Sequence, residues 1–238
     1  MQRLDVPIDT GEGPPLVLLQ GYGMRPGIYG GLARLLAERC RVLVPDLFAV
    51  EGGWSYPSVL GSLVATLDHL GLERVSMVAH SFGGGLQLGL AAQFPERVVE
   101  LVFSDTLGMR RGWRLADEAL RHPVRLLRLA TPAAAGSFAV SWARHPRQLL
   151  EAGWWGFTSS RDGATRVVAL AGLPTHVLWA NRDSVLNRRD GEAFAQAMDA
   201  SFTVAAPDDR RPVDHDWMFQ DPALFLCHLE DLKLEALA

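Results

Sequence analysis

Short apolar runs alternate along this chain with segments whose apolar residues recur at helical spacing, and this alternation restricts the fold more than any other feature. The expected strands are residues 15–19, 41–46, 74–80, 97–105, 175–180 and 201–206. These runs place apolar residues on both faces, which is typical of parallel strands that are covered by helices on each side. The sequence therefore predicts an α/β fold, with a mostly parallel central sheet flanked by helices.

Residues 106–172 interrupt the alternation. They contain helix-like segments punctuated by prolines, and they carry four of the seven tryptophans. We expect an α/β core formed by residues 1–105 and 173–238, with residues 106–172 as a small helical cap. Three of the cap tryptophans are candidates for a substrate pocket, although cap helices also need apolar faces simply to pack. They are Trp142, Trp154 and Trp155.

The composition excludes several classes of protein. Apolar residues make up 48% of the 238 residues and charged residues 21%, as in globular domains. The net charge is −4 and no basic stripe occurs, so nucleic acid is not an expected partner. No apolar stretch approaches the roughly 18 residues of a membrane-spanning helix, and residues 1–15 lack the apolar core of a secretory signal. With only Cys40 and Cys227, far apart, we expect a cytoplasmic protein without a cysteine metal site.

Ser81 lies where an apolar run meets glycines, in the stretch VAHSFGGGLQLG at residues 78–89. A serine at a strand-to-helix junction can be forced into a sharp, strained turn that lifts its Oγ away from the sheet. Such a junction needs small residues two places on either side, and Ala79 and Gly83 meet that need. We interpret Ser81 as a nucleophile. As a simple turn residue it would leave the glycine cluster unexplained.

Two backbone N–H groups are expected to stabilise negative charge beside Ser81. The helix that follows the serine presents free N–H groups at its start, and the N–H of Phe82 is the first candidate. The second candidate is the N–H of Tyr22, within the turn Gly21-Tyr22-Gly23 that ends the run at 15–19. Together they would form an oxyanion hole.

With these features the chain resembles the α/β-hydrolase family, from about Leu16 to the C-terminus, with 106–172 in the place of that family's helical cap. In the family the nucleophile comes first, then the acid, then the histidine. The resemblance implies that Asp183, in WANRDSVL, is the acid and that His215, in VDHDWMFQDP, is the base. His215 would take the proton of Ser81, while Asp183 would fix the tautomer of the imidazole.

The chain departs from the usual family pattern at Ala79, Gln20, residues 46–49 and Asp214. The first three departures affect the shape of loops more than the chemistry. Asp214 and Asp216 flank His215, and we expect their charges to raise the pKa of its imidazole.

Asp105, His80 and the loop acids admit other interpretations. Asp105 also follows an expected strand, and some relatives take their acid from that position, but position and chain order favour Asp183. His80 alternates away from Ser81 and is interpreted as a packed core histidine. A metal cluster among the loop acids is not favoured, because such acids are usually solvated.

A different class of function is suggested by the residues 21–25, which follow a strand and resemble a dinucleotide-binding fingerprint with Asp46 as its acid. Pro26 stands at the third glycine position, and this reading leaves Ser81 unexplained. A third class is a catalytically silent partner protein on the hydrolase fold.

A serine nucleophile implies acyl transfer to water through an acyl-enzyme, without a cofactor or a metal. The expected substrate is therefore a small acyl molecule, as for an esterase. A carbon–carbon bond hydrolase, a lactonase and a cofactor-free perhydrolase would use the same residues and remain alternatives.

Overall fold

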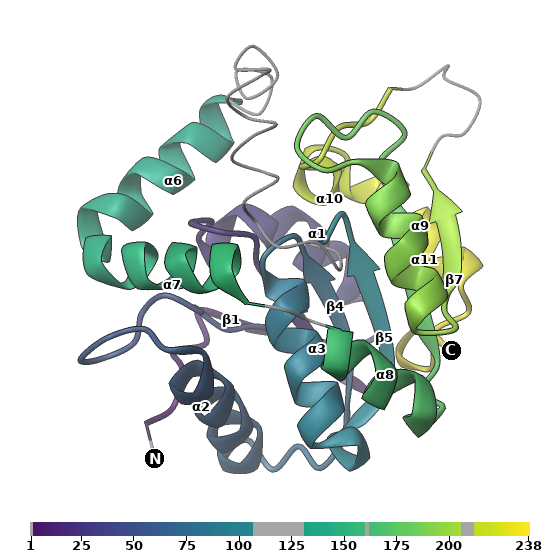
Figure 1. Cartoon of the computed structure of the whole chain (residues 1–238), viewed down its shortest axis with the longest axis horizontal. Helices are drawn as coiled ribbons and strands as arrows, with labels where there is room; N and C mark the ends of the chain where they lie inside the picture. Colours follow the sequence, from purple (N-terminus) through teal and green to yellow (C-terminus); the bar gives the residue numbers. More distant parts are fainter. Residues whose placement is uncertain (1, 107–130, 160–161, 206–211) are drawn as a thin grey trace.

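One open sheet forms the centre of the protein in the computed structural model, which describes residues 2–106, 131–159, 162–205 and 212–238 (Figure 1). The strands are β1 (Ile8–Thr10), β2 (Pro15–Leu19), β3 (Arg41–Val44), β4 (Val75–His80), β5 (Val98–Ser104), β6 (Thr175–Trp179) and β7 (Ser201–Val204). Their order is β1-β3-β2-β4-β5-β6-β7. All neighbouring strands are parallel except β1, which pairs antiparallel with β3. The expected mostly parallel sheet is confirmed.

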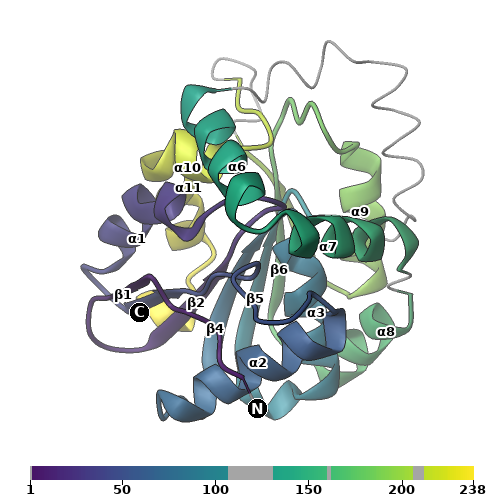
Figure 2. The same cartoon turned by 90° about the vertical axis from the view of Figure 1, so that its left-hand side faces the viewer.

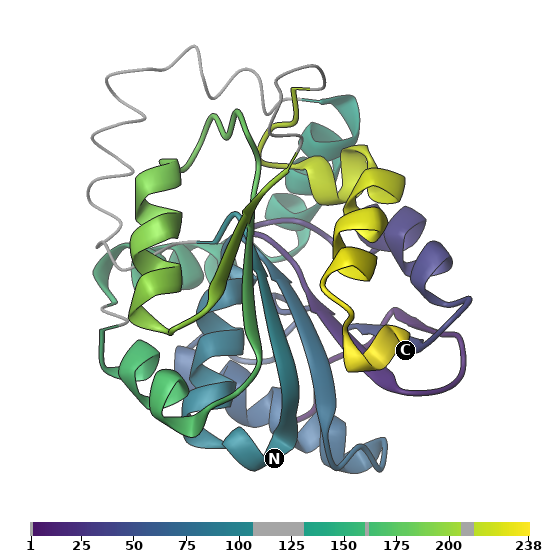
Figure 3. The same cartoon turned by 90° about the vertical axis from the view of Figure 1, so that its right-hand side faces the viewer.

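Helices cover both faces of this sheet (Figures 2 and 3). They are α1 (Gly30–Leu36), α2 (Tyr56–His69), α3 (Gly83–Gln93), α6 (Pro132–Arg144), α7 (Pro146–Thr158), α8 (Asp162–Ala171), α9 (Arg188–Ala197), α10 (Trp217–Gln220) and α11 (Pro222–Asp231). Helices α1 and α11 pack on one face, and α2, α3, α8 and α9 lie on the other. None of the described helices is long and apolar enough to cross a bilayer.

Two hydrophobic cores result from this layering, and they explain why the central strands carry apolar residues on both faces. Alternate residues of a strand point to opposite faces of the sheet. In β2, Leu16 and Leu18 join the core beneath α1 and α11, whereas Val17 and Leu19 join the core beneath α2 and α3. All six residues of β4 are buried.

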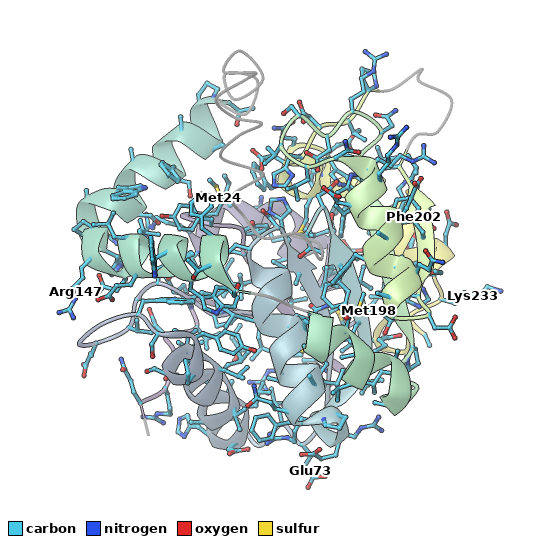
Figure 4. All side chains as sticks on the ribbon, viewed as in Figure 1. Met24, Glu73, Arg147, Met198, Phe202 and Lys233 are labelled. Atoms are coloured by element: carbon cyan, nitrogen blue, oxygen red, sulfur yellow. The ribbon has the colours of Figure 1, made fainter. Side chains whose placement is uncertain are left out.

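Helices α6 and α7 lie across the carboxyl ends of the strands (Figures 1 and 2). Polar contacts hold them to the loops below. Glu151 Oε2 accepts a hydrogen bond from the Trp54 N–H (2.6 Å), and Ser137 Oγ accepts one from the Arg25 N–H (2.9 Å). Arg147 projects from the outer side of α7 (Figure 4) and pairs with Glu151.

The third helix of the expected cap takes a different position, since α8 packs beside α3 and α9 on the face of the sheet. Residues 107–130 of the expected cap lie outside the described residues. Among the described ones, only α6 and α7 cover the carboxyl ends of the strands.

The turn between β4 and α3 is constrained by a close approach to β2. A Cβ placed on Gly83 would lie 2.8 Å from both Cβ and O of Leu19, and 2.9 Å from the Gln20 O. Two of these three atoms belong to the backbone of the adjacent strand and its exit, so they have little freedom to yield. Glycine at position 83 is therefore a packing requirement.

We predict that Gly83→Ala lowers the free energy of unfolding by about 1–3 kcal/mol, the usual cost of overpacking. Gly136→Ala is the matched control, because a Cβ at this position in α6 meets nothing within 4 Å. The control should raise the free energy of unfolding by up to about 1 kcal/mol, since alanine favours helix over glycine. Urea unfolding of both variants measures the difference. A Gly83→Ala protein as stable as the control would contradict the packing constraint.

Candidate active site

The expected site residues gather at the carboxyl end of the sheet. Strands β2 and β4 are neighbours, and the chain leaves β2 toward β3 on one side but leaves β4 toward β5 on the other. Such a reversal of strand order opens a crevice at the carboxyl ends, where α/β proteins bind their ligands. Tyr22 follows β2, Ser81 follows β4, and Asp183 follows β6, so all three lie at this edge.

Ser81 adopts a strained backbone conformation. Its φ is 48°, in the left-handed region that residues other than glycine rarely adopt. Hydrogen bonds hold both sides of the residue: the Ser81 N–H donates to the Ser104 O (3.0 Å), and the Thr106 hydroxyl donates to the Ser81 O (2.8 Å). The side chain is partly exposed. The sharp turn expected at this serine is therefore present.

The turn that contains Tyr22 lies directly beside Ser81. A Cβ placed on Gly21 would be 3.5 Å from the Ser81 Cβ. The Met24 N–H donates to the Gly21 O (3.1 Å) and closes the turn. Within the described part of the chain, neither the Tyr22 N–H nor the Phe82 N–H donates a hydrogen bond. Both groups are thus available as donors to an anion at this serine.

His215 is paired with Asp183. Its Nδ1–H donates to Asp183 Oδ2 over 3.0 Å, and the two side chains are only 7% and 2% exposed. The other carboxylate oxygen, Oδ1, accepts the N–H groups of Val185 (2.7 Å) and Leu186 (2.8 Å). Because Asp183 holds the Nδ1 side of the ring, the Nε2 nitrogen is left to exchange a proton with a substrate or a nucleophile.

The two acids that flank His215 differ in what they do. Asp214 Oδ1 accepts the N–H of His215 (2.7 Å) and the N–H of Ser184 (2.7 Å), so it ties the histidine loop to the acid loop. Burial alone would lower the pKa of His215, but the charges of Asp183, Asp216 and Asp105, together with the Asp183 hydrogen bond, raise it to about 9. The flanking acids were expected to raise the pKa of His215, and this holds for Asp216, which acts through its charge.

Asp105 lies close to this pair but is held by other partners. Its Oδ1 accepts the Ala180 N–H (2.7 Å), and its Oδ2 accepts the Trp217 Nε1–H (2.6 Å). The carboxyl group is fully buried, and burial together with the charge of Asp183 raises its pKa well above the usual value. Among the described residues, it is Asp183 rather than Asp105 that is hydrogen-bonded to His215.

Among the described residues, two groups of side chains have the chemistry and the spacing to hold a metal ion. The ligand atoms of His80, His215 and Asp216 lie within 4.8 Å of one another, and so do those of Asp105, Asp183 and His215. Both groups include His215. A metal ion in either would therefore compete for the imidazole that pairs with Asp183.

The cap aromatics form a layer over the residues beside Ser81. The Trp155 ring contacts the Phe82 ring at 5.4 Å between centroids. Trp142 packs against Phe138 (6.1 Å), which in turn contacts Tyr22 (6.2 Å). Two of the three expected pocket tryptophans thus belong to the packing above the two candidate oxyanion residues.

Trp154 has a different environment. Trp154 is 65% exposed, and it lines an open groove of about 560 Å³ together with Trp54 and Leu150. This outer groove is also lined by Trp155, whose ring contacts the Phe82 ring at 5.4 Å between centroids, as the Trp54 ring does at 5.6 Å. The sequence could not distinguish the faces of α7, because all four residues at 154–157 are aromatic or glycine and no polar residue marks the exposed face.

We predict that the imidazole of His215 titrates near pH 9 and that Asp216→Asn lowers this midpoint, because the variant removes one of the carboxylates that favour the charged ring. Titration of the histidine Cε1–H resonances by NMR measures both values. Asp231→Asn, at the exposed end of α11, is the control and should leave the midpoint unchanged. A midpoint near 6.5 in the wild-type protein would contradict the prediction.

Comparison with known proteins agrees with the fold described above. The sequence profile described as "alpha/beta hydrolase fold" matches residues 14–125. A 2-hydroxymuconate semialdehyde hydrolase of Pseudomonas putida is 34% identical over 110 residues, which are 42% of this chain and 39% of that protein. The chain thus spans about two fifths of the length of this relative.

Solved structures match nearly the whole chain. A thermophilic esterase from Thermogutta terrifontis superposes with a TM-score of 0.79 at 18% identity, covering 99% of this chain and 94% of the esterase. A meta-cleavage product hydrolase from Pseudomonas fluorescens IP01 gives 0.75 at 19% identity, covering 96% and 93%. The open, mostly parallel sheet and these matches show that the chain has the α/β-hydrolase fold.

Proposed function

We propose that this protein is a serine hydrolase that cleaves a carboxylic ester or a related acyl substrate through an acyl-enzyme. The observation that carries the proposal is the strained Ser81, with its φ of 48°, beside two backbone N–H groups that have no partner among the described residues. The Asp183–His215 pair at the same edge of the sheet supplies the base. An esterase is also among the proteins of similar structure.

In the proposed reaction, Ser81 Oγ attacks the acyl carbon and its proton passes to His215 Nε2. The N–H groups of Tyr22 and Phe82 stabilise the oxyanion, and Asp183 stabilises the imidazolium. Cleavage of the C–O bond releases the alcohol, which takes the proton from His215. Water then attacks the acyl-enzyme by the same route, giving the carboxylic acid and free Ser81.

The cap is proposed to supply the walls of the substrate site. Helices α6 and α7 place Phe138 and Trp155 over Tyr22 and Phe82, and pockets for small ligands are mainly apolar with few polar anchors. An apolar acyl or aryl group suits such walls. Trp154, which faces the outer groove, is left out of this proposal.

A second candidate is hydrolysis of a carbon–carbon bond on the same residues. It is favoured by the 34% identity to a protein named as a 2-hydroxymuconate semialdehyde hydrolase. The two candidates differ in the leaving group, which is an oxygen in an ester and a carbon in a semialdehyde of this kind. Incubation with a graded panel of acyl esters and, separately, with 2-hydroxymuconate semialdehyde distinguishes them by the product released.

We predict that a fluorophosphonate probe labels Ser81 and that Ser81→Ala abolishes the labelling. The probe phosphonylates a serine that a base activates, and the strained turn places Ser81 at the same edge of the sheet as the Asp183–His215 pair. Mass spectrometry of the tryptic peptides locates the added mass. Ser104→Ala, which removes a neighbouring buried hydroxyl, is the control and should keep the labelling. Labelling of another serine, or of none, would refute the proposed mechanism.

We predict that Asp183→Asn lowers turnover far more than Asp105→Asn does. Loss of the triad carboxylate leaves the imidazole in the wrong tautomer, a defect worth up to ~10⁴-fold in serine proteases. Asp105→Asn keeps an oxygen acceptor for the Ala180 N–H, so its main effect should be on stability. Turnover of the best ester and the melting temperature are measured for both variants. Equal losses of turnover would move the acid to position 105.

A further inference from the structure

A chain of three hydrogen bonds passes behind Ser81 and joins the turn of Tyr22 to the loop of His215. The Gly21 N–H donates to Tyr29 Oη (2.9 Å), Tyr29 Oη lies 2.9 Å from His80 Nδ1, and His80 Nε2 lies 2.9 Å from the His215 carbonyl oxygen. Tyr29 and His80 are 0% and 1% exposed. Neither side chain has a role in the reaction proposed above.

The groups at the two ends of this hydrogen-bond chain fix the direction of every hydrogen bond in it. The carbonyl of His215 can only accept, so the proton of His80 is on Nε2. Burial and the charge of His215 lower the pKa of His80 to about 3, so the ring is neutral and its Nδ1 accepts. Tyr29 therefore donates to Nδ1 while its oxygen accepts from the Gly21 N–H. Burial raises the pKa of Tyr29, which keeps its hydroxyl protonated.

The residues of this hydrogen-bond chain are also tightly packed. A Cβ on Gly21 would lie 2.9 Å from His80 Nδ1, so a side chain at position 21 would collide with the ring. Phe219 of α10 packs edge-on against both rings, at 5.5 Å from Tyr29 and 6.1 Å from His80. His80 directly precedes Ser81, so the position of the His80 ring is coupled to that of the strained turn.

We propose that Tyr29 and His80 are positioning residues, which hold the Tyr22 turn and the His215 loop at fixed places on either side of Ser81. The inference rests on the proposed function. Tyr22 would supply an oxyanion donor and His215 the base, and both interactions strengthen as the transition state forms. Loosening either loop should therefore slow the chemical step more than it weakens binding.

Removal of one link leaves a buried polar group without its partner. Tyr29→Phe deprives the Gly21 N–H of its acceptor and His80 Nδ1 of its donor, while the ring and its contact with Phe219 remain. His80→Phe deprives both Tyr29 and the His215 carbonyl. Because buried hydrogen-bond chains act as a unit, the two variants should not have additive effects.

The test is the rate at which a fluorophosphonate labels Ser81, measured over a range of probe concentrations. For Tyr29→Phe we expect the limiting rate to fall by about tenfold, less than the ~10²–10³-fold loss on deleting an oxyanion donor outright. The probe concentration at half the limiting rate should change by less than about twofold, since ground-state binding is retained. In ester hydrolysis, kcat should fall in the same way while KM changes little.

Thr66→Val is the matched control. The Thr66 hydroxyl is also buried, accepts a backbone N–H (Leu4, 2.8 Å) and donates to the Ser62 O (2.7 Å), but it lies in α2, away from the site. This variant should lose thermal stability and keep the wild-type labelling rate. The control thereby separates general loosening of the fold from loss of position at Ser81.

A second arm uses His80→Gln, His80→Phe and the double variant Tyr29→Phe/His80→Phe. Glutamine keeps an N–H able to reach the His215 carbonyl, so His80→Gln should label faster than His80→Phe. The double variant should be about as slow as the slower single variant. If His80→Phe does not fold, Tyr29→Phe and His80→Gln carry the test.

The possible results are distinct. If Tyr29→Phe loses stability as Thr66→Val does but labels at the wild-type rate, the two residues are structural only and the inference is overturned. Additive losses in the double variant would also overturn it, because the residues would then act separately. If the wild-type protein is not labelled at all, the proposed function fails first and the inference fails with it.

Discussion

The close approach of α3 to β2 is the constraint on which the rest of the site depends. Gly83 brings the first turn of α3 against the backbone of Leu19 and Gln20, at distances that exclude any side chain. The chain must therefore reverse sharply at Ser81, and the residue takes a φ of 48° that an open turn would not impose. Strain of this kind persists only where the surrounding structure enforces it. Here the hydrogen bonds on both sides of Ser81 and the packing of Gly83 enforce the strain together.

Electrostatics around His215 adds a second constraint. Three carboxyl groups, those of Asp183, Asp216 and Asp105, raise the pKa of one buried imidazole to about 9. Burial raises the pKa of Asp216 to about 6, despite the opposing charge of the histidine. The surrounding carboxylates thus favour the charged form of the imidazole, while burial opposes it.

The sequence predicted those parts of the structure whose causes are local. The strands were predictable because burial on both faces leaves continuous apolar runs, and the turn at Ser81 because small residues flank it within two positions. His80 was predicted to be buried, which is confirmed, but its hydrogen bonds were not, since their partners are brought together by the fold from positions 21, 29 and 215. For the same reason Asp214 was expected to act by charge, whereas it bonds the N–H of Ser184 on another loop.

A site assembled from separate loops needs bonds that join those loops. Asp214 joins the histidine loop to the acid loop, and Tyr29 with His80 joins the histidine loop to the turn at Tyr22. Glu151 and Ser137 attach the helices above to two further loops of the core. In each case a side chain bonds to backbone, so the contact fixes a loop without depending on the loop's own side chains. None of these bonds involves the aromatic side chains that α6 and α7 place against Tyr22 and Phe82, so the walls proposed for the substrate site and the bonds that hold its loops are built from different residues.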